Sequence, residues 1–174
     1  MMILLTGGSA CGKSSYAEGL CMAFPGPRYY LAAMRPAGEG GMEKIARHRA
    51  MRAGKGFETI ERYTGYDHLK LPRRGTALLE CICNLTANEM FDERGNITDP
   101  VRPVLDGVEA LERQCDRLIV ITNDVGSGGG DYEPAVREYV RALGEINAAL
   151  ARRASHVYEL VCGIPLVLKG ELLK

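Results

Sequence analysis

Residues 7–14 fit the pattern G-x-x-x-x-G-K-[ST] at every fixed position. This pattern is typical of a phosphate-binding loop, in which glycines let backbone N–H groups curl around an anion. In such a loop the lysine reaches the outer phosphates, and the serine hydroxyl is a ligand for Mg²⁺. The predicted phosphate-binding residues are Gly7, Gly8, Ser9, Ala10, Cys11, Gly12, Lys13 and Ser14. A nucleotide is therefore the expected ligand, and the fate of its phosphates depends on other residues.

A phosphate-binding loop that works with Mg²⁺ needs an acid near the metal, usually at the end of a neighbouring strand. Glu80 ends the apolar run 76–80, and Asp124 follows the apolar run 118–122. The carboxyl ends of parallel strands meet at one edge of a sheet, so both acids are candidates. Acids also follow strands without any metal, so position alone does not choose between Glu80 and Asp124.

A row of basic residues surrounds the histidine His48. If residues 42–53 form a helix, Lys44, His48 and Arg52 fall at i, i+4 and i+8 on one face. Flanking cations hold an imidazole neutral, which leaves a nitrogen lone pair, and they attract a polyphosphate. These are the requirements for nucleophilic attack on phosphorus. A solvated basic helix face with an incidental histidine fits the same spacing.

The elements that must position these residues alternate along the chain. Runs of strand length are found at 2–6, 28–33, 76–81, 117–122, 156–162 and 164–168. Helices are expected at 13–23, after the loop, and at 134–153, where apolar residues recur at helical spacing behind Pro134. This alternation predicts an α/β fold with a mostly parallel sheet, and the short connection at Gly163 predicts an antiparallel edge at the C-terminal end. Asn147 lies on the apolar helix face, where an amide satisfied by backbone is expected.

Composition and charge limit the classes of protein to which the chain can belong. The chain has 174 residues, with 22 basic and 22 acidic side chains, and we expect a single nucleotide-binding domain over 1–174. A balanced charge gives no general attraction to nucleic acid or to a membrane surface. No apolar run approaches the roughly 18 residues that span a bilayer, so a cytoplasmic protein is expected. The six cysteines include no C-x-x-C pair, which argues against a zinc or redox motif and for mostly buried thiols.

Taken together, these residues resemble the bifunctional adenosylcobinamide kinase/adenosylcobinamide-phosphate guanylyltransferase family of cobalamin biosynthesis, CobU. A phosphate-binding loop alone would be shared with many kinases, whereas this ordered set covers nearly the whole chain. The segments that carry the resemblance are 2–8, 12–14, 45–49, 59–61, 78–81, 120–126 and 161–165.

The resemblance implies a RecA-like P-loop fold, a homotrimer and two consecutive reactions. A nucleoside triphosphate, ATP or GTP, would phosphorylate adenosylcobinamide. GTP would then guanylylate the enzyme, and GMP would pass to adenosylcobinamide phosphate with release of pyrophosphate. His48 matches the histidine that carries GMP, so the candidate catalytic residues are His48, Lys13 and Glu80. Ser14 and Glu80 are the candidate Mg²⁺ ligands. Further positions that match the family around the guanine nucleotide are Ala32, Ala33, Met34, Arg49, Ala50, Met51, Arg52, Glu61 and Glu80.

The chain also departs from the family pattern. Ala10-Cys11 stands where the family usually has Arg-Ser, and Ala33-Met34 where it has Ala-Thr. Asp124-Val125-Gly126 leads into a glycine-rich stretch at 126–130 where the family has an apolar one. Two alternatives therefore stay open from sequence. One is a P-loop small-molecule kinase that leaves His48 idle, and the other is a nucleotide-binding switch that senses nucleotide through residues 126–130.

Overall fold

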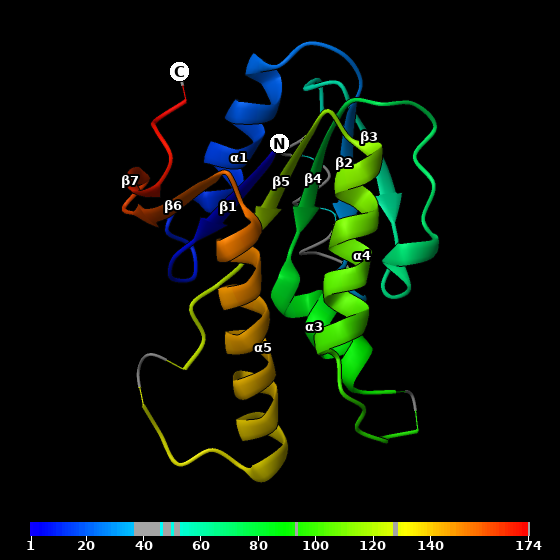
Figure 1. Ribbon diagram of the computed structural model, residues 1–174, viewed down its shortest axis with the longest axis vertical. Coiled ribbons are helices and arrows are strands. Elements are labelled where there is room, and N and C mark those ends of the chain that lie inside the picture. The colour runs from blue at the N-terminus through cyan, green and yellow to red at the C-terminus, as the bar shows by residue number, and fades with distance from the viewer. Residues whose placement is uncertain (37–45, 47–49, 51–52, 93, 127–128, 174) are drawn as a thin grey trace.

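In the computed structural model, the strands form one seven-stranded sheet with the order β3-β2-β4-β5-β1-β6-β7 (Figure 1), and apolar runs form its inner strands. The structure describes residues 1–36, 46, 50, 53–92, 94–126 and 129–173. The strands are β1 (Met2–Thr6), β2 (Arg28–Ala32), β3 (Phe57–Glu61), β4 (Thr76–Glu80), β5 (Arg117–Ile121), β6 (His156–Val161) and β7 (Ile164–Lys169). All neighbours pair in parallel except β6 and β7, which are antiparallel. The predicted α/β class and its antiparallel C-terminal edge are confirmed.

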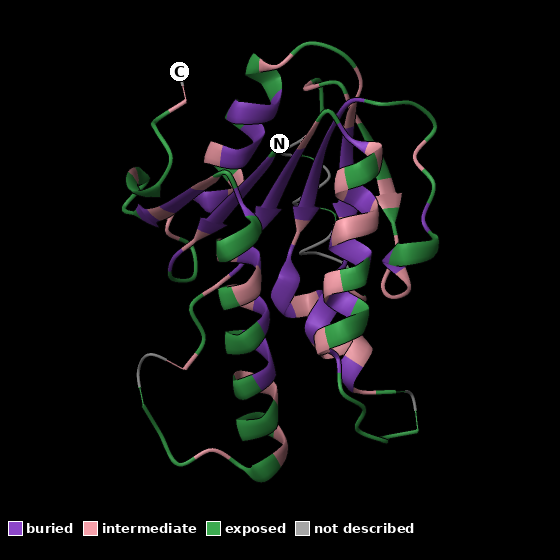
Figure 2. Ribbon diagram, viewed as in Figure 1, coloured by how far each residue is buried: buried purple, intermediate pink, exposed green. Residues whose placement is uncertain are grey.

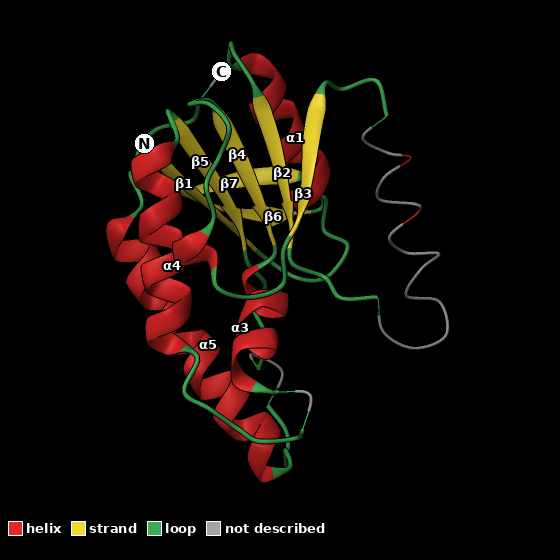
Figure 3. Ribbon diagram, turned by 90° about the vertical axis from the view of Figure 1, so that its right-hand side faces the viewer, coloured by secondary structure: helices red, strands yellow, loops and turns green. Residues whose placement is uncertain are grey.

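Helices cover both faces of this sheet. They are α1 (Lys13–Ala23), α3 (Ile82–Met90), α4 (Val101–Gln114) and α5 (Pro134–Arg153), with a short 3-10 helix η1 (Tyr66–His68). The sheet lies between α1 on one side and α4 and α5 on the other (Figure 3). Because the central strands β1, β4 and β5 are buried on both faces, they read as apolar runs rather than as alternating ones (Figure 2). The exposed sides of α4 and α5 face solvent.

Six of the predicted strands are present, each within one residue of its expected limits, and the helices at 13–23 and 134–153 are confirmed. The sequence analysis did not predict β3, α3 or α4. The predicted helix over 42–53 lies mostly outside the described residues, although Ala46 and Ala50 are helical. None of the described helices is long and apolar enough to cross a bilayer. Four of the six cysteines are buried, as expected.

Asn147 of α5 ties that helix to the carboxyl end of β5. Its Oδ1 accepts a hydrogen bond from the Thr122 hydroxyl at 2.7 Å, and its Nδ2 donates to the backbone oxygen of Asn123 at 3.4 Å. The amide is therefore satisfied by one backbone group and one hydroxyl, which confirms a structural role for Asn147. The contact fixes the residues that follow β5 at the edge where the strands end.

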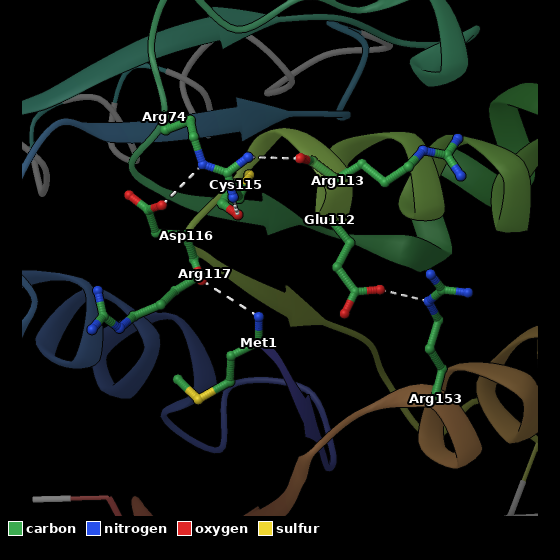
Figure 4. A pocket seen from close by; sticks show the side chains of 8 residues that line it. All are labelled: Met1, Arg74, Glu112, Arg113, Cys115, Asp116, Arg117 and Arg153. Carbon is green, nitrogen blue, oxygen red and sulfur yellow. Dashed lines mark hydrogen bonds and ion pairs between the residues drawn. The ribbon is translucent and has the colours of Figure 1, made fainter.

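The opposite, amino edge of the sheet is joined to the helices by arginines (Figure 4). Arg74, just before β4, donates to the backbone oxygens of Arg113 at 2.9 Å and Cys115 at 2.7 Å, and to Asp116 Oδ1 at 3.1 Å. Two of these acceptors are carbonyls at the end of α4, which have no partner within the helix. The pocket at this edge is lined by Met1, Arg74, Glu112, Arg113, Cys115, Asp116, Arg117 and Arg153. Both of its acids are paired with arginines, Asp116 with Arg74 and Glu112 with Arg153, and the contacts of Arg74 join the start of β4 to the end of α4 and to the residue before β5.

Candidate active site

The phosphate-binding loop connects β1 to α1 at the carboxyl edge of the sheet. Gly7 and Gly12 have φ of +134° and +99°, a conformation that side chains rarely adopt. A Cβ on Gly7 would lie 2.6 Å from the backbone oxygen of Leu160, and a Cβ on Gly12 would lie 3.0 Å from Cα of Gly163. Glycine is therefore required at both positions by shape as well as by φ.

The turn between β6 and β7 forms the wall behind this loop. Its two central residues, Cys162 and Gly163, both have positive φ, as in the tight turns that join paired antiparallel strands. The N–H of Gly163 donates to the backbone oxygen of Cys11 at 2.8 Å. The C-terminal hairpin is thus fastened directly to the phosphate-binding loop.

Lys13 is buried although it carries a charge, with 6% of its surface exposed. Its ammonium group donates to the backbone oxygens of Gly7 at 2.9 Å and Gly8 at 2.5 Å, and lies 3.6 Å from Cys11 Sγ. A buried ammonium needs such partners because its desolvation is costly. The loop therefore holds a fixed positive charge among its own backbone groups.

Ser14, in the first turn of α1, meets Glu80 at the end of β4. The Ser14 hydroxyl donates to Glu80 Oε1 at 2.6 Å, and the Tyr30 hydroxyl donates to Glu80 Oε2 at 2.7 Å. The two residues that were predicted as metal ligands are thus in direct contact, although they are 66 positions apart. Asp124, the other candidate acid, is exposed, and its N–H donates to the backbone oxygen of Gly7 at 3.4 Å.

Several of the predicted nucleotide residues share one register row at the same edge. Ala32 of β2 pairs with Glu61 on one side and with Glu80 on the other. The chain beyond β2 is held in place as well, because the N–H of Ala33 donates to the backbone oxygen of Glu80 at 3.0 Å. Asn88 of α3 donates to the backbone oxygen of Ala33 at 2.7 Å. The strand ends therefore present Glu61 and Glu80 on either side of β2.

Part of the predicted site lies outside the described residues, namely His48, Arg49, Met51 and Arg52. Ala50 is helical and exposed, and Met34 is half-buried beyond the end of β2. The structure thus joins Ser14 of the loop to Glu80 and places Ala32, Ala33 and Glu61 on the neighbouring strand ends. The predicted role of His48 stays a prediction.

A pair of thiols follows Glu80. A hydrogen bond from the Cys81 thiol lowers the pKa of Cys83 below its usual range, helped by the backbone of Asn123 and opposed by burial. The same hydrogen bond, together with burial, raises the pKa of Cys81. Within the described part of the chain, no three His, Cys, Asp or Glu side chains are grouped to hold a metal ion. Both thiols are buried and belong to the hydrophobic core.

Sequence reasoning missed Tyr30, Asn88 and Gly163 as parts of this site. For Tyr30 a signal was present, because alternation along the run 28–33 places it on the same face as Ala32. Asn88 gave none, and Gly163 was predicted only as part of a turn, since the contacts of both depend on which distant segments the fold brings beside the loop and the end of β2.

Comparison with known proteins identifies the family. The sequence profile of cobinamide kinase / cobinamide phosphate guanyltransferase, CobU, matches residues 3–168. The chain belongs to this family. CobU proteins combine a kinase with a guanyltransferase, so the predicted enzyme class is confirmed, as is the P-loop character of the fold.

Named relatives agree with the CobU assignment over their full length. The bifunctional adenosylcobalamin biosynthesis protein CobU of Salmonella typhimurium is 30% identical over 184 residues, which covers 97% of this chain and 100% of that protein. The protein of the same name from Escherichia coli is 29% identical with the same coverage. The bifunctional adenosylcobalamin biosynthesis protein CobP of Pseudomonas aeruginosa is 32% identical over 180 residues, covering 99% of this chain and 100% of its own.

Proposed function

We propose that this chain phosphorylates adenosylcobinamide with a nucleoside triphosphate and then transfers GMP from GTP to adenosylcobinamide phosphate through His48. The observation that carries the proposal is the contact between Ser14 and Glu80 beside a complete phosphate-binding loop, in a chain of the CobU family. The loop supports binding of a triphosphate, and membership of the family supports adenosylcobinamide as the acceptor.

In the phosphoryl transfer, the backbone amides of the loop and the Lys13 ammonium would hold the phosphates of ATP or GTP. The hydroxyl of Ser14 and the carboxylate of Glu80 fit Mg²⁺, which is usually bound through one or two carboxylates together with substrate phosphates. When bound, Mg²⁺ would neutralise negative charge on the phosphates. The acceptor hydroxyl of adenosylcobinamide would then displace the nucleoside diphosphate from the outer phosphorus.

In the guanylyl transfer, a nitrogen of neutral His48 would attack the α-phosphorus of GTP. A nitrogen–phosphorus bond would form as the bond to pyrophosphate breaks, and the basic neighbours Lys44 and Arg52 would offset the developing charge. A phosphate oxygen of adenosylcobinamide phosphate would next attack the same phosphorus. This second displacement would give adenosylcobinamide-GDP and return His48 to its free form.

The deciding experiment incubates the protein with Mg²⁺ and GTP labelled at the α-phosphate. The wild-type protein is expected to take up an acid-labile label, and His48→Ala is expected to remain unlabelled. His68→Ala is the matched control, because His68 is an exposed histidine, with 81% of its side chain accessible, and has no assigned role. A wild-type protein that takes up no label would overturn the guanylyl half and favour a kinase with one activity.

Further features of the proposal concern the whole protein. A single domain over 1–174 is proposed from the length of the chain, and the absence of a nucleic-acid partner from its balanced charge. A cytoplasmic location is proposed from the apolar runs, which are all far shorter than the roughly 18 residues that span a bilayer. A homotrimer is proposed from the resemblance to the family. Large apolar residues exposed on and beside β7 support self-association, namely Val161, Ile164, Leu166, Val167, Leu168 and Leu172.

A further inference from the structure

Tyr30 of β2 reaches the carboxylate that the proposed function places beside the nucleotide. Only 3% of Tyr30 is exposed, and its hydroxyl donates to Glu80 Oε2 at 2.7 Å. The other oxygen of that carboxylate accepts the hydrogen bond of Ser14 at 2.6 Å. Two different elements, the strand β2 and the first turn of α1, thus hold the two oxygens of Glu80.

The sheet itself determines where the Tyr30 hydroxyl lies. Tyr30 pairs with Leu78 in the parallel register of β2 and β4, and Leu78 lies on the same face as Glu80, two positions on. The ring therefore extends along the neighbouring strand toward Glu80. An edge-on contact with Phe57, with ring centroids 6.3 Å apart at 84°, fixes the ring from the β3 side.

We propose that Tyr30 is a positioning residue that orients the Glu80 carboxylate toward Ser14 and so prepares the site for a nucleotide with Mg²⁺. The inference rests on the proposed function in one respect, namely that Glu80 faces the metal-bound nucleotide. A glutamate side chain has several rotamers, and a hydrogen bond to one oxygen selects among them. Partners of this kind, one step away from the metal, typically change metal affinity by about 10- to 100-fold when removed.

A merely structural role would also bury Tyr30 against an acceptor, so the test must separate orientation from packing. Tyr30→Phe keeps the ring that contacts Phe57 and removes the hydroxyl that donates to Glu80. Tyr29→Phe is the matched control. Tyr29 is the neighbouring buried tyrosine of β2, it points to the opposite face, and its hydroxyl accepts from the N–H of Arg73 at 3.2 Å.

The measurement is the affinity for GTP with and without Mg²⁺, obtained by calorimetric titration of each variant. In Tyr30→Phe the gain in affinity on adding Mg²⁺ is expected to shrink about tenfold, the lower end of the range for such partners. The affinity without Mg²⁺ is expected to stay at the wild-type value, which also shows that the loop is folded. Tyr29→Phe is expected to keep the full gain.

Glu80→Gln separates failure of this inference from failure of the proposed function. If Glu80→Gln loses the gain in affinity from Mg²⁺ and Tyr30→Phe keeps it, the positioning role of Tyr30 is overturned and the assignment of Glu80 to the metal stands. If both variants keep the gain, the positioning role is overturned together with the assignment of Glu80 to the metal. If Tyr30→Phe loses affinity equally with and without Mg²⁺, Tyr30 acts through packing and the inference is again wrong.

Discussion

Two neighbouring glycines of the phosphate-binding loop, Gly7 and Gly8, differ in whether a side chain would be tolerated. Gly7 has a positive φ and faces the Leu160 carbonyl, whereas a Cβ on Gly8 would meet nothing within 4 Å. We expect Gly7→Ala to lower the free energy of unfolding by about 1–3 kcal/mol, since both strain and a clash with backbone are introduced. Gly8→Ala is expected to change it by less than about 0.5 kcal/mol. Denaturant unfolding of the two variants tests the difference, and equal losses would contradict it.

Lys13 provides the second prediction at the scale of single residues. Because both proposed reactions need a triphosphate held in the loop, Lys13→Ala is expected to lower kcat/KM of both by at least about 100-fold, the usual cost of losing one donor to developing charge. The measurements are transfer from GTP labelled at the γ-phosphate and at the α-phosphate. Loss of only one activity would show that the two reactions use different nucleotide sites.

The loop residues could be predicted from the sequence because their chemistry and spacing are local. The contact between Ser14 and Glu80 could be expected only in outline, from the rule that strand ends converge. Alternation along β2 places Tyr30 on the same face as Ala32, but its contact with Glu80 could not be assigned, since that contact depends on the register between β2 and β4. Such long-range pairing leaves no local mark in a single sequence.

At the scale of elements, Arg74 holds the end of α4 to the strands beside it. Arg74→Ala is expected to lower the free energy of unfolding by about 1–2 kcal/mol, because three hydrogen bonds from a partly exposed guanidinium are lost. Arg113→Ala is the control, since Arg113 forms an exposed i,i+4 pair with Glu109 whose loss costs about 0.5 kcal/mol or less. Thermal or denaturant unfolding gives both values, and a larger effect of Arg113→Ala would contradict this assignment.

The missed elements have physical causes as well. Helix α4 contains Pro103 and Gly107, residues that usually mark the end of a helix. Pro103 is tolerated in the first turn, where its missing N–H has no helical partner. Gly107 is required because a Cβ there would lie 2.8 Å from Cβ of Tyr66 in η1. Strand β3 lies at the edge of the sheet and is half-exposed, so its short sequence lacks the apolar run of the inner strands.

At the scale of the whole molecule, the exposed apolar residues of β7 predict self-association. In the part of the chain that the structure describes, no further strand lies beside the outer edge of β7, and five of its six residues are exposed. Leu168→Glu is expected to weaken assembly by at least about tenfold, because a charge would enter the contact. Light scattering after size exclusion should show a trimer for the wild type and a smaller mass for the variant.

Ile97→Glu serves as the control for that measurement, since Ile97 is a similarly exposed apolar residue, at 53%, in the segment between α3 and α4 and not on β7. It is expected to leave the mass unchanged. A monomeric wild type, or loss of assembly in Ile97→Glu instead of Leu168→Glu, would contradict the β7 surface as the contact.

The hydrogen bond from the N–H of Gly163 to the backbone oxygen of Cys11 links the start of β7 to the phosphate-binding loop. Strand β7 begins at the turn whose amide is hydrogen-bonded to the phosphate-binding loop. A second copy of the chain bound to β7 and a nucleotide bound in the loop would therefore both affect the backbone atoms of this turn. Coupling between two binding events is reciprocal in free energy. If assembly raises the affinity for nucleotide by some factor, bound nucleotide must raise the affinity between the subunits by the same factor. The amount of GTP in solution would then set the fraction of assembled protein, and dilution of the protein would weaken its hold on GTP.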